Sequence, residues 1–516
     1  MRPLWKTISR TIRGLPWIRF AAGALAGGSG LAVTFVLRWL GLGVFLPEVA
    51  EEFVVYRIPG ELESFAIRAL GEGAKLLGLI AAVAVFLALP GLYGLTYRRV
   101  QRWLGRRSLV MAFYALTSAG ILLLAILPLL DGGFFGSNTS AGPWFASFSQ
   151  LVGSFVYAAV LDYFFVDVSA RYPEGFSLSR RQFLVGSVGA IVLAVLAIYG
   201  LASLAVKKGR LVFASIGEMF LKERTPASEF YVVTKNVIDP TVDEGSWRLS
   251  IGGLVATPAT YDYPQLLARS DPSDPDHADE IVTLECVSNE VGGNLISNAR
   301  WQGVRLAALL QSAGLDPAAD IWIVFKCADG YTAAIPRDRA LNPNTIVAVL
   351  MNDAPLTTAH GFPARIIVPG LYGMFHAKWL TRIEAVKGEY RGFWQQKGWT
   401  NQGQIHTTAI IATPPDGMVV NGRVHIGGVA FAGDRGISLV EVSTDGGLTW
   451  NAATRNPTPS NLTWVLWTYD WTPSRSGSFR IVARAVDGMG GPEDPNSAPP
   501  FPNGSSGYDS ITLLVG

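Results

Sequence analysis

One stretch in the C-terminal half of the chain reads Leu284-Glu285-Cys286-Val287-Ser288-Asn289. It continues through Gly292-Gly293 to Ala299-Arg300-Trp301-Gln302-Gly303. This pattern predicts an apolar strand that ends at the cysteine and enters a polar loop. The two glycines allow the backbone of that loop to approach a bulky ligand closely. A cysteine in an apolar strand is usually a small core residue, so the loop that follows it is what indicates a binding site.

Two more segments follow in the same half: His360-Gly361-Phe362-Pro363-Ala364-Arg365 and Tyr372-Gly373-Met374-Phe375-His376-Ala377-Lys378-Trp379. They bring two histidines, an arginine and a lysine into an otherwise acidic region, interleaved with Gly, Pro and aromatic residues. A solvated loop is one interpretation of these segments. A built pocket is the other, since an arginine can clamp a phosphate bidentately while lysine and histidine add donors.

The three segments together resemble the motifs of the sulfite-oxidase-like molybdopterin domain, over roughly Thr225–Trp399. The resemblance implies that Cys286 supplies a thiolate to molybdenum, a soft ligand that suits this redox metal. For Cys327, a place near the pterin and a buried structural thiol are equally open. The residues that the resemblance implies for binding the cofactor are Tyr231, Cys286, Cys327, His360, Arg365, His376, Ala377 and Lys378, and the catalytic residues are Cys286 and Tyr390.

The sequence departs from sulfite oxidases at positions that carry basic, anion-binding residues in that family. Val233, Glu290 and Val291 occupy these positions, and Lys235 is a partial substitute. The resemblance therefore implies the cofactor and two-electron oxygen-atom chemistry on a small substrate, but not sulfite itself. It also implies a separate electron-transfer partner. The alternative is a non-catalytic envelope protein that keeps the fold for binding or assembly.

Charge divides the 516 residues into two parts. Up to Arg210 there are 20 Lys/Arg and 10 Asp/Glu, a net of +10, and the remainder carries 22 and 30, a net of −8, which together give +2. The basic part is also the more apolar one, so we expect a membrane section followed by a soluble one. The acidic soluble part argues against nucleic acid as a partner.

Five apolar stretches are long enough to cross a hydrocarbon core, which takes ~20 helical residues. They are Phe20–Leu46, Leu76–Tyr97, Leu109–Leu130, Trp144–Phe165 and Phe183–Val206. Arginine-rich loops alternate with an acidic one, so the positive-inside rule predicts a cytoplasmic N-terminus and an outer location for everything after Val206. Within the spans, Arg38 is expected to snorkel to an interface, while a pair with Asp162 is an open alternative.

Three further patterns bear on the membrane section. Ser179-Arg180-Arg181-Gln182-Phe183-Leu184 resembles a twin-arginine export signal before the fifth span. Gly23 and Gly27 form a small-xxx-small face suited to helix packing. No histidine precedes residue 211, so a histidine-ligated haem is not expected in this section. Anchoring, docking of a partner subunit and a quinone site all remain open as roles for these helices.

The soluble part is expected to contain two domains. Irregular alternation of strand and helix patterns, such as Trp247–Ile251, Val304–Leu315 and Ile321–Phe325, predicts an α+β domain. From Gln404 short alternating strands predict an immunoglobulin-like sandwich, which resembles the dimerisation domain of the same family and implies a homodimer. The predicted organisation is thus multi-domain: transmembrane region 1–210, linker 211–226, molybdopterin domain 227–400 and immunoglobulin-like domain 404–516.

Overall fold

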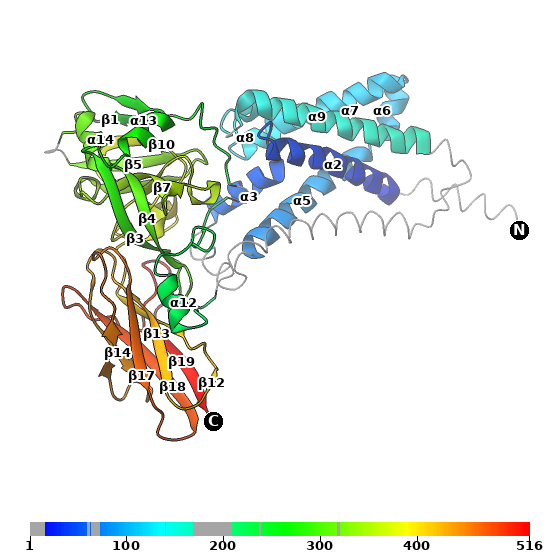
Figure 1. Cartoon of the computed structure of the whole chain (residues 1–516). Helices are drawn as coiled ribbons and strands as arrows, with labels where there is room; N and C mark the ends of the chain where they lie inside the picture. Colours follow the sequence, from blue (N-terminus) through cyan, green and yellow to red (C-terminus); the bar gives the residue numbers. More distant parts are fainter. Residues whose placement is uncertain are drawn as a thin grey trace, which may run out of the picture. The chain divides into compact units, whose positions relative to one another are not determined.

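The computed structural model describes residues 16–58, 62, 73–139, 141–168, 209–236, 239–316 and 320–516. The chain divides into two compact units. One contains Met1–Ile58 and Ala66–Ala205, and the other contains Pro59–Phe65 and Val206–Gly516. The first unit is helical, whereas the second consists mainly of strands (Figure 1).

Long apolar helices make up the helical unit. Its elements are α2 (Pro16–Trp39), α3 (Leu46–Arg57), α5 (Gly73–Gly94), α6 (Tyr97–Leu104), α7 (Arg107–Ile121), the π-helix η1 (Leu122–Ile126), α8 (Leu127–Leu129), η2 (Phe134–Gly136), α9 (Gly142–Tyr163) and η3 (Phe164–Val168). Three stretches are long and apolar enough to cross a membrane, Arg19–Trp39, Arg107–Leu129 and Gly142–Val166. The pair Gly78–Gly94 and Tyr97–Leu104, bent by 42°, makes a fourth if counted as one span. The fifth predicted span and the twin-arginine pattern lie outside the described residues.

The first predicted span is too long at its C-terminal end. Helix α2 stops at Trp39 because the chain turns at Gly41, which has a φ of +76°, and a separate helix begins at Leu46. This turn brings Arg38 to Glu48, where two guanidinium nitrogens lie 3.0 Å from the two carboxylate oxygens. The alternative prediction, a pair between Arg38 and Asp162, is therefore wrong.

Glycines allow α2 to pack closely on its neighbours. A Cβ atom on Gly27 would lie 2.5 Å from Cγ of Pro90 in α5, and one on Gly30 would lie 2.6 Å from the carbonyl oxygen of Gly153 in α9. Neither contact leaves room for a side chain, so the predicted small-residue packing face is confirmed for this part of α2.

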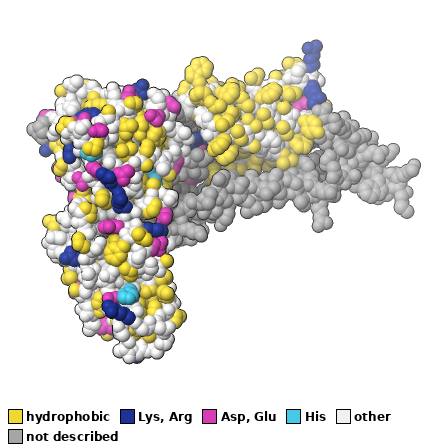
Figure 2. Space-filling view, viewed as in Figure 1, with side chains coloured by type: hydrophobic (Ala, Val, Ile, Leu, Met, Phe, Trp, Pro, Cys, Tyr) yellow, Lys and Arg dark blue, Asp and Glu magenta, His cyan; other side chains and the backbone are white. Residues whose placement is uncertain are grey.

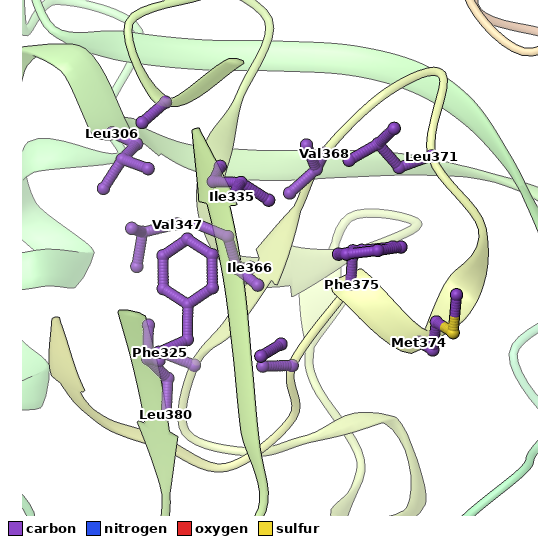
Figure 3. Packing of buried hydrophobic residues seen from close by; sticks show 14 of the residues in the cluster. Leu306, Phe325, Ile335, Val347, Ile366, Val368, Leu371, Met374, Phe375 and Leu380 are labelled. Carbon is purple, nitrogen blue, oxygen red and sulfur yellow. The ribbon is translucent and has the colours of Figure 1, made fainter. Parts of the chain in front are cut away.

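Two sheets form the α+β part of the second unit. One has the order β3-β4-β7-β8, with β9 also pairing with β7, and the other has the order β2-β1-β10-β5-β6. The strands are β1 (Leu249–Gly253), β2 (Ala259–Tyr261), β3 (His277–Glu285), β4 (Ile296–Arg305), β5 (Ile321–Cys327), β6 (Thr332–Pro336), β7 (Ile346–Met351), β8 (Ala354–Pro355), β9 (Arg365–Ile367) and β10 (Leu380–Lys387). Phe325 of one sheet packs beside Val347 and Ile366 of the other in a shared apolar core (Figure 3).

Short helices connect these strands: α12 (Ile216–Leu221), α13 (Tyr263–Arg269), α14 (Leu306–Ser312), α15 (Arg337–Ala340), η4 (Thr358–His360), η5 (Gly373–Phe375) and α16 (Phe393–Gln396). The helix expected at Val304–Leu315 is shorter than predicted, because Val304 still belongs to β4, where it pairs with Val347 of β7. Gly314 follows the helix with a φ of +73°, which agrees with the predicted stop. Helix α12 lies inside the segment predicted as a linker.

The C-terminal part is a sandwich of two sheets, with orders β11-β13-β17-β16 and β12-β19-β18-β14-β15. Its strands are β11 (Thr408–Thr413), β12 (Val419–Val420), β13 (Val424–Phe431), β14 (Ile437–Ser443), β15 (Asn451–Ala452), β16 (Thr454–Arg455), β17 (Val465–Trp471), β18 (Gly477–Asp487) and β19 (Ser510–Val515). Alternating residues such as Ile426, Val442 and Ile481 form one core between the sheets. The predicted β-rich domain is therefore confirmed.

Candidate functional site

Cys286 is the first residue after strand β3, where the sequence predicts the strand to end. Its backbone N–H still donates to the carbonyl of Leu295, at 2.9 Å, and its side chain is 8% exposed. The Sγ atom lies 3.1 Å from the hydroxyl oxygen of Ser288. Both cysteines of the chain are free and buried, so a thiol is available at this position.

Asn289 braces the loop after Cys286. Its side-chain amide donates to Glu285, at 3.0 Å, and its side-chain oxygen accepts from the N–H of Leu295, at 2.9 Å. Its backbone carbonyl accepts from the hydroxyl of Ser505, at 2.8 Å, in the C-terminal sandwich. The loop that begins with Cys286 is therefore fixed from both domains.

Arg365 joins the two segments that the sequence singles out. It lies at the start of β9 and is 5% exposed; its guanidinium donates to the carbonyls of His360, at 3.3 Å, and His376, at 3.2 Å. Its carbon Cζ lies 4.9 Å from the centre of the Trp301 ring. Among the described residues, its Nε has no hydrogen-bond partner. Burial lowers the pKa of Arg365 to about 10.

The two histidines are held by the backbone. In His376, Nδ1 accepts from the N–H of Val368 and Nε2 lies 3.0 Å from the carbonyl of Leu371. In His360, Nε2 lies 2.8 Å from the carbonyl of Ala227. Because both rings are buried, the pKa falls to about 3 for His376 and about 4 for His360. Both rings are therefore neutral, and their hydrogen bonds hold the neighbouring backbone in place.

This burial predicts a pH dependence of folding stability. Unfolded histidines titrate near pH ~6.5, so the stability due to these two groups is complete above that pH and is lost as pH falls toward the folded values. Near pH 5 they lower the free energy of unfolding by at most roughly 2.7 kcal/mol for each unit by which the pH falls. The measurement is urea unfolding of the full chain in detergent, followed by tryptophan fluorescence. In the variant His376→Gln, the free energy of unfolding is expected to change with pH about half as steeply. The matched control, exposed His425→Gln, will keep the wild-type slope; an unchanged slope in His376→Gln would show that the ring is not held neutral.

Tyrosines surround the thiol of Cys286. A Cβ atom on Gly373 would lie 2.6 Å from the hydroxyl of Tyr231 and 3.8 Å from Cα of Cys286, so these three residues meet. Burial raises the pKa of Tyr231, Tyr331 and Tyr372 far above the ordinary value, and the nearby Cys286 raises it further in each. These phenols therefore stay protonated and can donate hydrogen bonds at neutral pH.

The remaining predicted residues lie at several places around this core. The backbone carbonyl of Ala377 accepts from Ile366, which fixes β9 beside the histidine run. The amine of Lys378 donates to the carbonyl of Ala359, at 3.0 Å. Cys327 ends β5, and burial, followed by the charge of Asp329, raises its pKa well above the ordinary value. Tyr390 is half-buried after β10, and its backbone carbonyl accepts from Asn401.

The sequence interpretation missed Tyr331, Ser288 and the side chain of Asn289. Ser288 and Asn289 were visible as the polar residues directly after Cys286. Tyr331 follows the Asp329-Gly330 turn after β5, and its hydroxyl donates to the carbonyl of Met374. No sequence signal connects Tyr331 to Met374, because their contact depends on how distant parts of the chain pack.

The described residues fit the expected cofactor. The arginine Nε that is buried without a partner can bind an anion such as the pterin phosphate, because an unpaired buried cation is costly unless compensated. In the part of the chain that the structure describes, no three His, Cys, Asp or Glu side chains are grouped to hold a metal ion.

Comparison with known proteins gives the same assignment. A family model described as "Oxidoreductase molybdopterin binding domain" matches residues 236–394, and one described as "Mo-co oxidoreductase dimerisation domain" matches residues 400–494. The sulfane dehydrogenase SoxCD from Paracoccus pantotrophus is a solved structure with 22% identity and a TM-score of 0.48, covering 56% of this chain and 80% of that one. This structural likeness is too weak to bear on function.

Curated relatives of the chain include sulfite oxidases and an uncharacterised oxidoreductase. The mitochondrial sulfite oxidase of Drosophila melanogaster is 34% identical over 235 residues, which cover 38% of this chain and 41% of that protein. The chain thus spans less than half the length of that relative. The "Uncharacterized oxidoreductase YuiH" of Bacillus subtilis is 32% identical over 161 residues, which cover 31% of this chain and 76% of that protein. The chain therefore belongs to the sulfite-oxidase-like family of molybdopterin-dependent oxidoreductases.

Proposed function

We propose that the chain is a membrane-anchored molybdenum oxidoreductase that transfers an oxygen atom to or from a small molecule in a two-electron reaction. One observation carries this proposal. Gly373 lies against both the hydroxyl of Tyr231 and the backbone of Cys286, and His376, three residues later, accepts a hydrogen bond from the buried guanidinium of Arg365, whose Nε is unpaired. A soft metal ligand and an anion clamp thus both lie beside the segment Gly373–His376.

The chain's own residues divide the work of holding the cofactor. Cys286 would bind molybdenum as a thiolate. Arg365 and Lys378 would bind the phosphate, while His360 and His376 position the backbone around Arg365, and Tyr231 lines the cofactor. When bound, the cofactor supplies the two-electron oxygen-atom chemistry. Tyr390 remains our candidate for a substrate contact, and Cys327 our candidate for a neighbour of the pterin.

The charges near the site favour a substrate with little negative charge. Lys235 lies 3.9 Å from the carboxylate of Asp329, and its side chain is 10% exposed. Its charge is therefore already balanced inside the protein. Glu290, in the Cys286 loop, adds an exposed negative charge. We expect a neutral S-oxide or N-oxide to react faster than sulfite.

The first test is the molybdenum content of the detergent-purified full chain, followed by turnover with a redox dye. About one molybdenum per chain is expected, together with turnover of dimethyl sulfoxide or trimethylamine N-oxide that exceeds the turnover of sulfite. Faster turnover of sulfite would overturn the substrate assignment alone. No metal, from a host that makes the cofactor, would favour the non-catalytic binding protein instead.

Membrane anchoring is supported by the surface of the helical unit. Hydrophobic side chains cover much of the face seen in Figure 2, and the exposed residues include Trp39, Trp103 and Trp144. Trp39 ends α2, Trp103 lies near the end of α6 and Trp144 lies in the first turn of α9. Tryptophans at helix ends are typical of membrane interfaces. Basic residues of α6 and its flanks favour a cytoplasmic N-terminus. The fifth predicted span, Phe183–Val206, would then place both soluble domains on the outer side.

Sidedness can be measured with reporter fusions. Alkaline phosphatase, which is active only outside the cytoplasm, is expected to be active when fused after Gly516 and inactive when fused after Leu104. The opposite result would reverse the proposed orientation.

We also propose that the sandwich domain, which we assign to the immunoglobulin-like class, holds two copies of the chain together. The match of this domain to the dimerisation family model supports a homodimer. Light scattering of the purified chain, corrected for detergent, should give twice the chain mass of 55.5 kDa. The mass of a single chain would refute the dimer.

A further inference from the structure

A cavity of about 440 Å³ lies among the helices of the first unit. Its walls come from α2, α5, α7, η1 and α9, together with Leu46 and Thr96 (Figure 1 shows the helices). The volume falls within the range of small-molecule sites, which is ~300–1,000 Å³. The cavity is partly open at the surface of the helical unit, so a small molecule could enter it.

The wall is formed in part by irregular helix geometry. The π-helix η1 contributes Leu122 and Ile126, and such wide turns are rare and are often found at functional sites. Helix α5 contributes Pro90, whose ring cannot continue the hydrogen-bond ladder. It has no N–H to donate to the carbonyl of Phe86, four residues earlier in the helix. Its own carbonyl accepts from the hydroxyl of Tyr157, at 3.2 Å. Helix α2 thus packs closely on α5 and α9 at Gly27 and Gly30, and the cavity lies beside these contacts.

One buried hydroxyl group in this cavity has no partner. Ser154 is 3% exposed and lines the cavity, yet its Oγ atom makes no hydrogen bond within the described part of the helical unit. Ser118, which also lines the cavity, differs because its hydroxyl donates to the carbonyl of Tyr114. Gln150, four residues before Ser154, donates its amide N–H to the carbonyl of Val44, at 2.8 Å, which leaves the amide oxygen to accept.

The lining therefore combines an apolar body with a donor and an acceptor. Leu31, Leu46 and Phe86 are among its apolar residues, and the rings of Tyr93 and Tyr157 lie 6.5 Å apart with 20° between their planes. A lipid acyl chain would leave the Ser154 hydroxyl unpaired. A histidine-ligated haem is ruled out, because no histidine precedes residue 211.

We propose that this cavity binds the ring of a membrane quinone. A quinone carbonyl would accept from Ser154, and a hydroxyl of the reduced ring would donate to the amide oxygen of Gln150. The ring is flat and apolar, and its oxygens match the polar atoms of the lining. This inference rests on the proposed membrane anchoring and names the class of electron partner that the proposed enzyme would use, since quinones also exchange two electrons.

The test is a titration of the full chain in detergent with a short-tailed benzoquinone, followed by quenching of intrinsic fluorescence. Saturable binding to the wild type is expected. Ser154→Ala should raise the Kd roughly five- to tenfold, because one hydrogen bond is lost. The matched control Ser118→Ala, whose hydroxyl is already bonded, should change the Kd by less than about twofold. Leu122→Trp should fill the cavity and abolish binding while the helical circular dichroism is unchanged.

Three results would overturn the proposal: no saturable binding to the wild type, equal binding by Ser154→Ala, or equally strong displacement by a saturated fatty acid. Molybdenum content and resistance to carbonate extraction are measured on the same membranes. A chain that keeps its metal and stays in the membrane but does not bind the quinone refutes the cavity assignment alone. A chain that carbonate removes from the membrane, or that lacks the metal, refutes the proposed function instead.

Discussion

Replacing Cys286 with alanine will lower turnover by more than about a hundredfold, while the protein still folds. Loss of outer-shell partners of a metal typically costs ~10–100-fold, and loss of the ligand itself should cost more. Alanine leaves only a small gap at a position directly after the strand, and the loop keeps its brace through Asn289. The measurement is dye-linked turnover per folded chain, with the secondary structure checked by circular dichroism.

The second cysteine provides a matched control for this prediction. Cys327 is as buried as Cys286, but burial and Asp329 raise its pKa, so it stays a neutral thiol and is poorly suited to bind a metal. Cys327→Ala should therefore keep turnover within about tenfold of the wild type. An active Cys286→Ala variant, or an equal loss in both variants, would refute Cys286 as the ligand.

Arg365→Met will lower the molybdenum content per chain by about tenfold or more, with little change in the stability of the cofactor-free protein. Two effects on that stability oppose each other. Methionine removes a buried cation whose lowered pKa corresponds to a desolvation cost of roughly 3 kcal/mol. It also leaves the carbonyls of His360 and His376 without a donor, at ~1–3 kcal/mol each. The net change is expected within about 2 kcal/mol.

The contrast between the two measurements is what tests the role of Arg365. Molybdenum is measured in protein from a host that makes the cofactor, and unfolding by urea is measured in protein from a host that does not. Arg365→Lys is the matched variant, because it keeps the charge but cannot clamp a phosphate with two nitrogens. It should retain more metal than Arg365→Met. A cofactor-free Arg365→Met protein that loses most of its stability would assign Arg365 to the fold instead of the cofactor.

The sequence predicted the features that depend on neighbours along the chain. Alternation of apolar residues located β13 without error at Val424–Phe431, and the polar loop after Cys286 marked the end of β3. Gly314 marked the stop of α14. Each of these signals comes from backbone conformation or from burial of one face, which a few adjacent residues determine.

The errors arose where distant residues decide the outcome. Hydropathy alone extended the first span past Trp39, because Leu40 and Leu42 are apolar on either side of a turn at Gly41. Pairing with Val347 holds Val304 in a strand, although its spacing also suits a helix. Arg38 pairs with Glu48, a residue that the hydropathy pattern assigned only to the following loop.

The candidate site was predictable as a set of motifs but not as a geometry. The motifs named Cys286, Arg365 and both histidines, yet they did not indicate that the rings serve the backbone. They also did not indicate that Tyr331 reaches the same place from another sheet. Such contacts follow from how sheets pack, and no local pattern encodes them.

The hydroxyl of Ser505 donates to the carbonyl of Asn289, and this bond limits which sandwich domains could replace the present one during evolution. The sandwich is not a freely exchangeable attachment, because one of its loops completes the support of the loop that carries Cys286. A sandwich transplanted from a distant relative would have to bring an equivalent donor to the same spot. Recombination between such genes should therefore retain both domains together, all the more because the core of the α+β domain also includes Ile410, Val429 and Leu466 of the sandwich.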